Sequence, residues 1–140
     1  MWTTAVTADT DLPRAAVWAA LEALHRGELS YPGADVFELH GPFAVGTELD
    51  VTPEGQDTFR SVIIELVPGE RYADRTEYEG LSLLFRHTLA DTPTGTRVTH
   101  ELEIDGAGAD EVGPELGPQI SGDFGAALGA LFREAARMTA

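Results

Sequence analysis

Hydrophobic and polar residues alternate along much of the chain. In the segment GTRVTHELEIDG, residues 95–106, one side of an extended backbone would carry Val98, His100, Leu102 and Ile104. Successive side chains of a strand point to opposite faces, so this period of two predicts a half-buried strand. The segment LSLLFRHTLA, residues 81–90, has the same pattern, with an inner face of Leu81, Leu83, Phe85, His87 and Leu89. Each strand therefore directs one histidine inward from an apolar face.

The rest of the pattern predicts a strand, a helix and a series of further strands. Residues 2–9 alternate and are rich in β-branched side chains, which is typical of a strand. Asp11 is a candidate N-cap for a helix over residues 12–24, and Pro13 is tolerated in its first turn. Six strands separated by short turns then follow, over residues 36–41, 46–52, 59–68, 71–78, 81–90 and 96–104. Short turns indicate an antiparallel meander, because parallel neighbours need long crossovers.

After the segment DGAGADEVGPE, residues 105–115, apolar residues recur every three or four positions. This spacing predicts an amphipathic helix of roughly 20–24 residues that runs to the end of the chain, with an apolar stripe of Leu116, Ile120, Phe124, Leu128, Leu131, Ala135 and Met138. Gly122, Gly125 and Gly129 lie inside it, and each costs about 1 kcal/mol relative to Ala. They indicate either close packing on the sheet or a helix that flexes or leaves space beneath it. The concave face of a twisted sheet is the large partner available for the stripe.

Composition and charge narrow the function classes. The 140 residues are 43% hydrophobic and 24% charged, which suits one domain spanning residues 1–140. The formal net charge of -15 repels phosphate backbones, so no nucleic-acid partner is expected. The absence of cysteine excludes disulfides and thiolate metal sites. Neither a membrane span nor a signal-peptide pattern is present, so we expect a cytoplasmic protein, for which a homodimer is compatible with the sequence.

The element order and several phrases resemble the START/birch-allergen-like superfamily (SRPBCC), and within it the polyketide cyclase/dehydrase-like proteins. The phrases are VWAAL (17–21), HGPFAVGTEL (40–49), ELVPGERY (65–72), GTRVTHELEIDG (95–106) and the closing amphipathic helix. The resemblance implies an α+β helix-grip fold, in which a seven-stranded antiparallel curved sheet wraps around a long C-terminal helix. It also implies a deep apolar cavity for lipids, polyketides, hormones or other hydrophobic small molecules. Members range from carriers to aromatase/cyclases, and no catalytic motif is common to all of them.

The turn DTPTG, residues 91–95, should join the two histidine-bearing strands as a hairpin. Residues whose numbers sum to about 187 then lie opposite each other, which places His87 against His100, with Cβ atoms about 4.5–5.5 Å apart. Three roles stay open for the pair: satisfied core histidines, polar or acid/base contacts to a ligand, and metal ligands. A transition metal needs a third protein ligand, and Asp74 is the only nearby acid predicted to face inward. We therefore expect no metal and no other cofactor.

Two faces compete for the interior in strand 71–78. Arg71, Arg75 and Glu77 are charged, so we assign their face to solvent and the face with Tyr72 and Asp74 to the interior. The expected ligand cavity is lined by Tyr72, Thr76, Tyr78, Leu83, Phe85, His87, Val98, His100, Leu102, Phe124 and Leu128. In strand 59–68 one face is expected to carry Arg60, Val62, Ile64 and Leu66.

Two main function classes fit these residues. The first is a non-catalytic protein that binds or carries a hydrophobic metabolite, because the sequence contains no phosphate loop, nucleophile elbow or HExxH motif. It requires an interior with space for a ligand. The second is an aromatase/cyclase-type enzyme, in which His87 or His100 exchanges protons with the substrate and Tyr78 or Tyr72 polarises a carbonyl. A protein that acts by pairing with another protein is a third class, which needs an exposed apolar patch.

Overall fold

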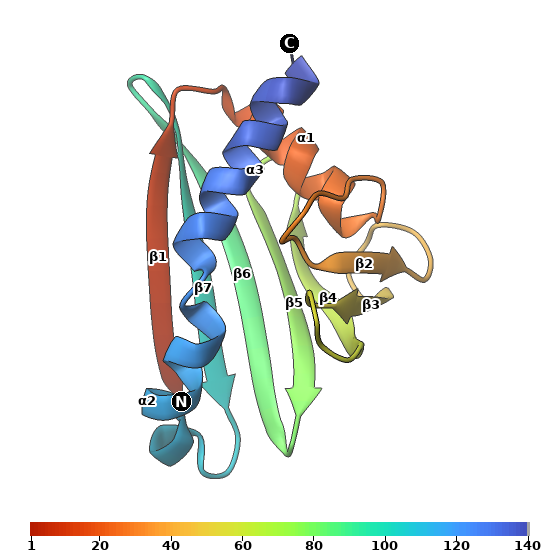
Figure 1. Cartoon of the computed structure of the whole chain (residues 1–140), viewed down its shortest axis with the longest axis vertical. Coiled ribbons are helices and arrows are strands. Elements are labelled where there is room, and N and C mark those ends of the chain that lie inside the picture. The colour runs from red at the N-terminus through yellow and green to blue at the C-terminus, as the bar shows by residue number, and fades with distance from the viewer. Residues whose placement is uncertain (140) are drawn as a thin grey trace.

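The computed structural model describes residues 1–139, which form one sheet and three helices (Figure 1). In chain order the elements are β1 (Trp2–Thr10), α1 (Arg14–His25), β2 (Val36–Leu39), β3 (Glu48–Thr52), β4 (Phe59–Val67), β5 (Arg71–Tyr78), β6 (Leu81–Thr92), β7 (Gly95–Asp105), α2 (Ala109–Ser121) and α3 (Phe124–Thr139). Within these residues the sheet order is β1-β7-β6-β5-β4-β3-β2, and every neighbouring pair is antiparallel. The predicted α+β architecture and antiparallel meander are confirmed.

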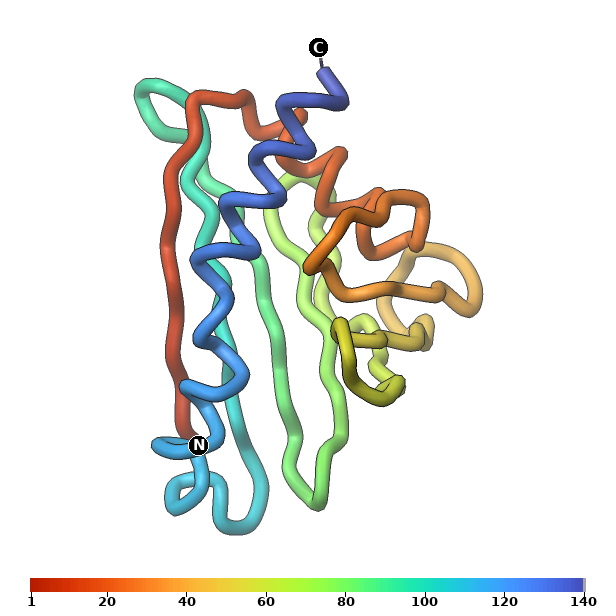
Figure 2. The backbone as a smooth tube through the Cα atoms, in the orientation of Figure 1, coloured from red at the N-terminus to blue at the C-terminus, as the bar shows by residue number. Residues whose placement is uncertain are grey.

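The helices cover one face of this sheet. α3 runs in front of β7, and α1 packs beside α3 and contacts β2 (Figure 1). β2 and β3 run across the direction of β6, so the sheet is strongly twisted (Figure 2). None of the described helices is long and apolar enough to cross a membrane.

Two groups of buried side chains fill the space between the sheet and the helices. The first lies under α1 and α3 and includes Val17, Leu21, Ile63, Tyr72, Val98 and Leu128. The second lies toward α2 and the start of α3 and includes Leu81, Leu83, Leu102, Ile104 and Phe124. The apolar residues that alternation assigned to the interior in β5, β6 and β7 belong to these groups, and Asp74, Thr76 and His100 are buried as well. Those face assignments are confirmed.

Strand β4 departs from simple alternation. Its register with β5 shifts between Ile63 and Glu65, which is a β-bulge. The bulge lets Ile63 and Leu66 both pack in the interior, although their numbers differ by three. The prediction that residues 60, 62, 64 and 66 share one face is therefore wrong. Arg60 lies exposed outside the core and forms ion pairs with carboxylates of β3.

The first helix does not use its predicted cap. α1 begins at Arg14, Pro13 occupies the N-cap position, and no side chain caps the helix, so the assignment of Asp11 is wrong. Proline suits this position because its ring restricts φ and the N–H that it lacks would have no partner there. The carbonyl of Pro13 accepts the first hydrogen bonds, from the N–H groups of Ala16 (3.0 Å) and Val17 (3.3 Å).

The C-terminal segment forms two helices instead of the single helix predicted from residue 116. α2 begins at Ala109, and Asp110 in its first turn interacts favourably with the positive helix N-terminus. The chain then breaks at Gly122, before α3. Pro118 lies inside α2 and has no N–H to donate, while a Cβ at Gly122 would come within 2.9 Å of the Pro118 carbonyl oxygen. The close approach to the Pro118 carbonyl explains why glycine suits the break at residue 122.

Close packing of helix on sheet occurs at glycines that the sequence analysis did not single out. A Cβ at Gly113 or Gly117 would overlap the Trp2 side chain, so α2 lies directly on this tryptophan of β1. At Gly125 and Gly129 a Cβ would have its nearest neighbour 4.0 Å and 3.6 Å away. Close packing therefore does not explain the glycines of α3.

Candidate functional site

His87 and His100 meet in the interior, as the hairpin register predicts. They are opposite each other in the pairing of β6 with β7. Their rings stack with centroids 3.9 Å apart and an angle of 26° between the planes. On its other side His100 stacks against Phe124 of α3, with centroids 3.7 Å apart and an angle of 11°. The two histidines thus lie between the sheet and the C-terminal helix.

A third buried histidine, His25, completes this group. It is the last residue of α1, and its ring lies 5.9 Å from that of His87 and 4.1 Å from that of Tyr72. Its Nδ1 donates a hydrogen bond to the carbonyl oxygen of Leu21, at 2.8 Å. His25 was not among the residues predicted from the sequence, although its spacing of four from Leu21 and eight from Val17 places all three on one helix face.

Tyr72 and Asp74 of β5 face the same interior. The Tyr72 hydroxyl donates a hydrogen bond to Asp74 Oδ2 at 2.8 Å. Tyr72 also lies opposite His87 in the sheet and stacks on Phe43, with centroids 5.7 Å apart. Asp74 is 5% exposed, so it is buried while keeping a small contact with solvent. The polar interior therefore combines three imidazoles, one phenol and one carboxyl.

Burial controls the charge of these groups. It lowers the pKa of His25 to about 4 and that of His100 to about 3, with repulsion from His25 acting in the same direction on His100. Burial also lowers the pKa of His87 well below 6.5, assisted by the other two histidines. It raises the pKa of Asp74 to about 7, although the hydrogen bond from Tyr72 opposes this shift. The imidazoles are therefore neutral at pH 7, and Asp74 is the group that changes charge near that pH.

Two of the imidazoles have an unsatisfied nitrogen. The Nδ1 atoms of His87 and His100 are buried and have no hydrogen-bond partner among the described residues. This differs from His25, whose Nδ1 bonds to the backbone, and from Thr76, whose hydroxyl bonds to that of Ser61. Buried polar atoms in native proteins nearly always have partners, so the two histidines are exceptions that need an explanation.

The other predicted lining residues divide between the two core groups. Val98 and Leu128 pack in the group that contains Tyr72, whereas Leu83, Phe85, Leu102 and Phe124 belong to the group near α2. Tyr78 lies apart from the histidines, at the end of β5, where its ring meets that of Phe59 at a centroid distance of 6.0 Å. The structure thus brings Tyr72, His87 and His100 together but places Tyr78 elsewhere.

The Phe124 ring occupies part of the expected cavity, because it stacks on His100. Two shallow depressions lie at the edges of the described structure, and neither is lined by His87 or His100. One, of about 310 Å³, is lined by Arg14, Glu70, Arg71, Thr88, Leu89, Ala90 and Asp91. The other, of about 330 Å³, lies between α2 and the β5–β6 turn and is lined by Tyr78, Glu79, Leu81, Ala107, Val112, Glu115, Leu116 and Gln119. Leu81, Leu116 and Tyr78 connect the second depression with the core group near α2.

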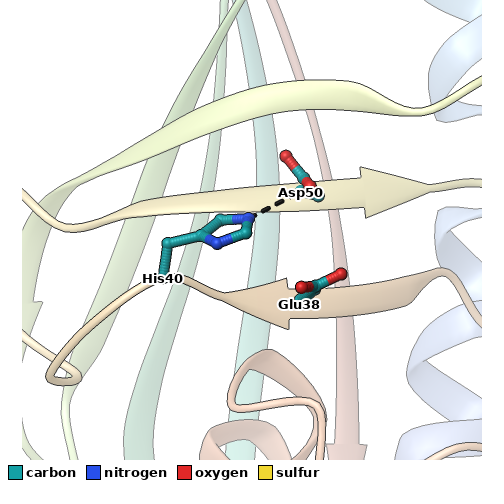
Figure 3. Close-up of side chains that lie close together, drawn as sticks. All are labelled: Glu38, His40 and Asp50. Carbon is teal, nitrogen blue, oxygen red and sulfur yellow. Dashed lines mark ion pairs between the residues drawn. The ribbon is translucent and has the colours of Figure 1, made fainter.

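Glu38, His40 and Asp50 form a separate cluster where β2 pairs with β3 (Figure 3). One potential ligand atom from each lies within 4.8 Å of the others, and His40 Nε2 is 3.0 Å from Asp50 Oδ2. Arg60 donates to the other oxygen of Asp50 at 2.7 Å. These contacts make the cluster a solvent-exposed network of ion pairs. It was not found from sequence because its members come together only through the β2–β3 pairing.

Comparison with known proteins identifies the fold. No protein-family model and no curated protein matches the sequence. Norcoclaurine synthase from Thalictrum flavum has a TM-score of 0.75 at 14% identity, over 96% of this chain and 86% of that chain. The Zhui aromatase/cyclase from a Streptomyces species has a TM-score of 0.72 at 17% identity, over 99% and 96% of the two chains. A structural-genomics target from Mesorhizobium loti has a TM-score of 0.66 at 17% identity, over 99% of both.

This chain has the helix-grip fold of the START/birch-allergen-like superfamily. The resemblance carried by the sequence phrases is confirmed at the level of the fold. In this helix-grip fold the gripped helix is α3, and the stacked pair His87 and His100 lies between it and the sheet.

Proposed function

We propose that the protein binds a largely apolar small molecule with a hydrogen-bonding group, in the interior between the sheet and α3. The observation that carries the proposal is the pair of buried, unpartnered Nδ1 atoms of His87 and His100. An unsatisfied buried polar atom costs about 1–3 kcal/mol of stability. A ligand hydroxyl or carbonyl that bonds to these imidazoles removes that cost, while the surrounding apolar side chains bind the rest of the molecule.

Partial exposure of the inner face of β6 supports this location. His87 and Phe85 keep some contact with solvent, whereas Leu83 and Leu89 on the same face are buried. The depression beside Tyr78 and Leu116 is lined by Leu81, the first residue of the same inner face. Because the Phe124 ring stacks on His100, a ligand that contacts this imidazole requires the ring to move, and Phe124 begins α3 two residues after the helix break at Gly122.

An acid–base enzyme of the aromatase/cyclase kind is the alternative, and one observation favours it. Burial raises the pKa of Asp74 to about 7, and a general acid or base works best with a pKa near the operating pH. The lowered pKa values of His87 and His100 make them weak bases. In this alternative Asp74 therefore exchanges the proton, and the Tyr72 hydroxyl polarises a substrate carbonyl. An aromatase/cyclase shares the fold, but at 17% identity that likeness extends only to the fold.

The binding proposal is tested by native mass spectrometry of the purified protein, followed by NMR titration of the histidine rings with 1-naphthol and 1-decanol. We expect either a co-purified apolar molecule or saturable shifts of the His87 and His100 ring signals. Signals of His40, which lies outside the core, should stay in place. His100→Phe keeps the bulk and should weaken 1-naphthol binding by about fivefold, the value of one hydrogen bond. Unmoved His87 and His100 signals with every probe, and no co-purified molecule, would contradict the proposal.

The enzyme alternative is separated from binding by turnover of a poly-β-carbonyl substrate. Asp74→Asn should then lower turnover by about a hundredfold while leaving binding of 1-naphthol in place. Binding without any turnover would support the carrier role and contradict the enzyme alternative.

We also propose that the protein is cytoplasmic and consists of one domain over residues 1–140. We propose further that it forms a homodimer, and light scattering after gel filtration measures this oligomeric state.

A further inference from the structure

Asp74 stands out among the carboxylates. Among the described residues it is the only buried acid, and its hydrogen bond comes from a neutral donor, the Tyr72 hydroxyl. No ion pair within 4.0 Å joins it to any described residue. Arginine side chains pair instead with carboxylates outside this interior, and those arginines are Arg14, Arg26, Arg60, Arg71, Arg75, Arg86, Arg97 and Arg137. A buried carboxylate without a cation is costly, so Asp74 lacks a positive partner that its ionised form would need.

The histidines beside Tyr72 do not supply this charge. His25 contacts the Tyr72 ring, His87 lies opposite Tyr72 in the sheet, and His100 stacks on His87. Their lowered pKa values leave all three neutral at pH 7. The interior thus contains neutral imidazoles and a single buried acid.

Two neighbouring acidic residues add negative charge. Asp35, in the segment between α1 and β2, is close enough to Asp74 to raise its pKa further. Asp123, directly before α3, acts in the same way on Asp35. Neither of these two acids forms an ion pair within the described part of the chain. Together with the net charge of -15, they create a negative potential that attracts cations toward the interior.

The surroundings of Asp74 are aromatic. The Tyr72 ring that bonds to Asp74 packs between His25, at 4.1 Å, and Phe43, at 5.7 Å. Aromatic faces bind both flat apolar groups and cations, because the ring face carries partial negative charge. A ring-bearing body with one positive group matches these features, whereas an anionic lipid does not.

We propose that the ligand carries a protonated amine on an apolar, ring-bearing body, and that Asp74 binds its ammonium group. The inference rests on the proposed function, because it names the chemical class that the same interior takes. Asp74 keeps 5% of its surface in contact with solvent, so its carboxylate is reachable when the covering rings shift. The Tyr72 hydroxyl, bonded to Oδ2, holds the carboxylate orientation and leaves Oδ1 to accept the ammonium hydrogen bond.

The test compares two probes of equal size, 2-phenylethylamine and 2-phenylethanol, by NMR titration at pH 8.0. The wild-type protein should bind the amine about tenfold or more tightly than the alcohol, as expected for a charge-assisted hydrogen bond. Asp74→Asn keeps an acceptor for the Tyr72 hydroxyl and should abolish this preference. Asp57→Asn, in the exposed turn before β4, changes the net charge equally and should retain the preference. At pH 6.0 the wild-type preference should shrink, because Asp74 becomes protonated.

Each outcome has a distinct meaning. Equal affinity of the two probes, or tighter binding of the alcohol, overturns the assignment of an amine and leaves the proposed function intact. An unchanged preference in Asp74→Asn overturns the role of Asp74. If neither probe binds and 1-naphthol also leaves the histidine signals unmoved, the proposed function itself fails. If Asp74→Asn does not fold, the comparison of amine with alcohol at two pH values in the wild-type protein decides the question.

Discussion

Replacing His100 with phenylalanine should flatten the dependence of folding stability on pH. In the folded protein burial lowers the pKa of His100 to about 3, against a value of 6.5 for the exposed ring. Between these values the unfolded chain binds more protons than the folded one, so the free energy of unfolding decreases as the pH falls. The stabilisation is fully present above pH 6.5 and is lost progressively below it.

The size of the effect follows from proton linkage. Between pH 7.0 and pH 5.5, uptake of a proton by His100 in the unfolded chain lowers the free energy of unfolding by about 1 kcal/mol. His25, with a folded pKa of about 4, contributes about 1 kcal/mol more, and His87 acts in the same direction. Asp74 opposes them by about 2 kcal/mol, because its folded pKa of about 7 lies above its unfolded value of 3.8. The wild-type protein should therefore lose stability on acidification, and His100→Phe should lose about 1 kcal/mol less.

Urea unfolding followed by the fluorescence of Trp2 and Trp18 measures this difference at the two pH values. Any packing change caused by the new phenylalanine acts equally at both pH values and cancels in the comparison. Ile104→Val is the matched control, because Ile104 is fully buried on the same face of β7. It should lower stability by about 1 kcal/mol at both pH values. If His100→Phe and the wild type lose the same amount on acidification, the conclusion that His100 is buried and neutral is refuted.

Two further predictions concern the scaffold. Gly117→Ala should destabilise the protein by about 1–3 kcal/mol, because its Cβ overlaps Trp2. Gly125→Ala in α3 meets only an ordinary contact and should stabilise the protein by up to about 1 kcal/mol. Thermal unfolding measures both variants, and equal effects would contradict the packing described for α2. Arg86→Gln should lower the free energy of unfolding by about 2 kcal/mol, because it leaves three glutamates without their cation around a side chain that is 20% exposed. Arg97→Gln removes a solvent-exposed ion pair and should lower it by about 0–1 kcal/mol, as measured by urea unfolding. Equal losses in these two variants would count against a structural role for the Arg86 network.

The histidine pair could be predicted because hairpin geometry is local. The short turn between β6 and β7 places Thr92 opposite Gly95, and every later pair, including His87 with His100, follows from it. Strict alternation in the same strands then fixes which side chains face inward. Both steps depend only on residues close together in sequence, so no knowledge of the rest of the fold was needed.

His25 and the bulge in β4 depend on contacts that are distant in sequence. The predicted first helix ended at Leu24, but the helix extends one residue further and buries His25 against Phe37 of β2. In β4 the extra residue between Ile63 and Glu65 is visible only in the pairing with β5. Alternation also assigns faces without fixing volumes, so it could not reveal that Phe124 stacks on His100 and occupies part of the expected cavity.

The polar interior is not required for folding. A phenylalanine in place of His100 would stack on Phe124 equally well and would bury no unpartnered nitrogen. A neutral residue at position 74 would remove a buried carboxyl that lacks a cation. Groups that lower stability at several neighbouring positions, on faces that are otherwise apolar, indicate a function that needs them. Since the three imidazoles stay neutral at pH 7, the charge on Asp74 alone decides whether this interior favours a cationic or an uncharged molecule.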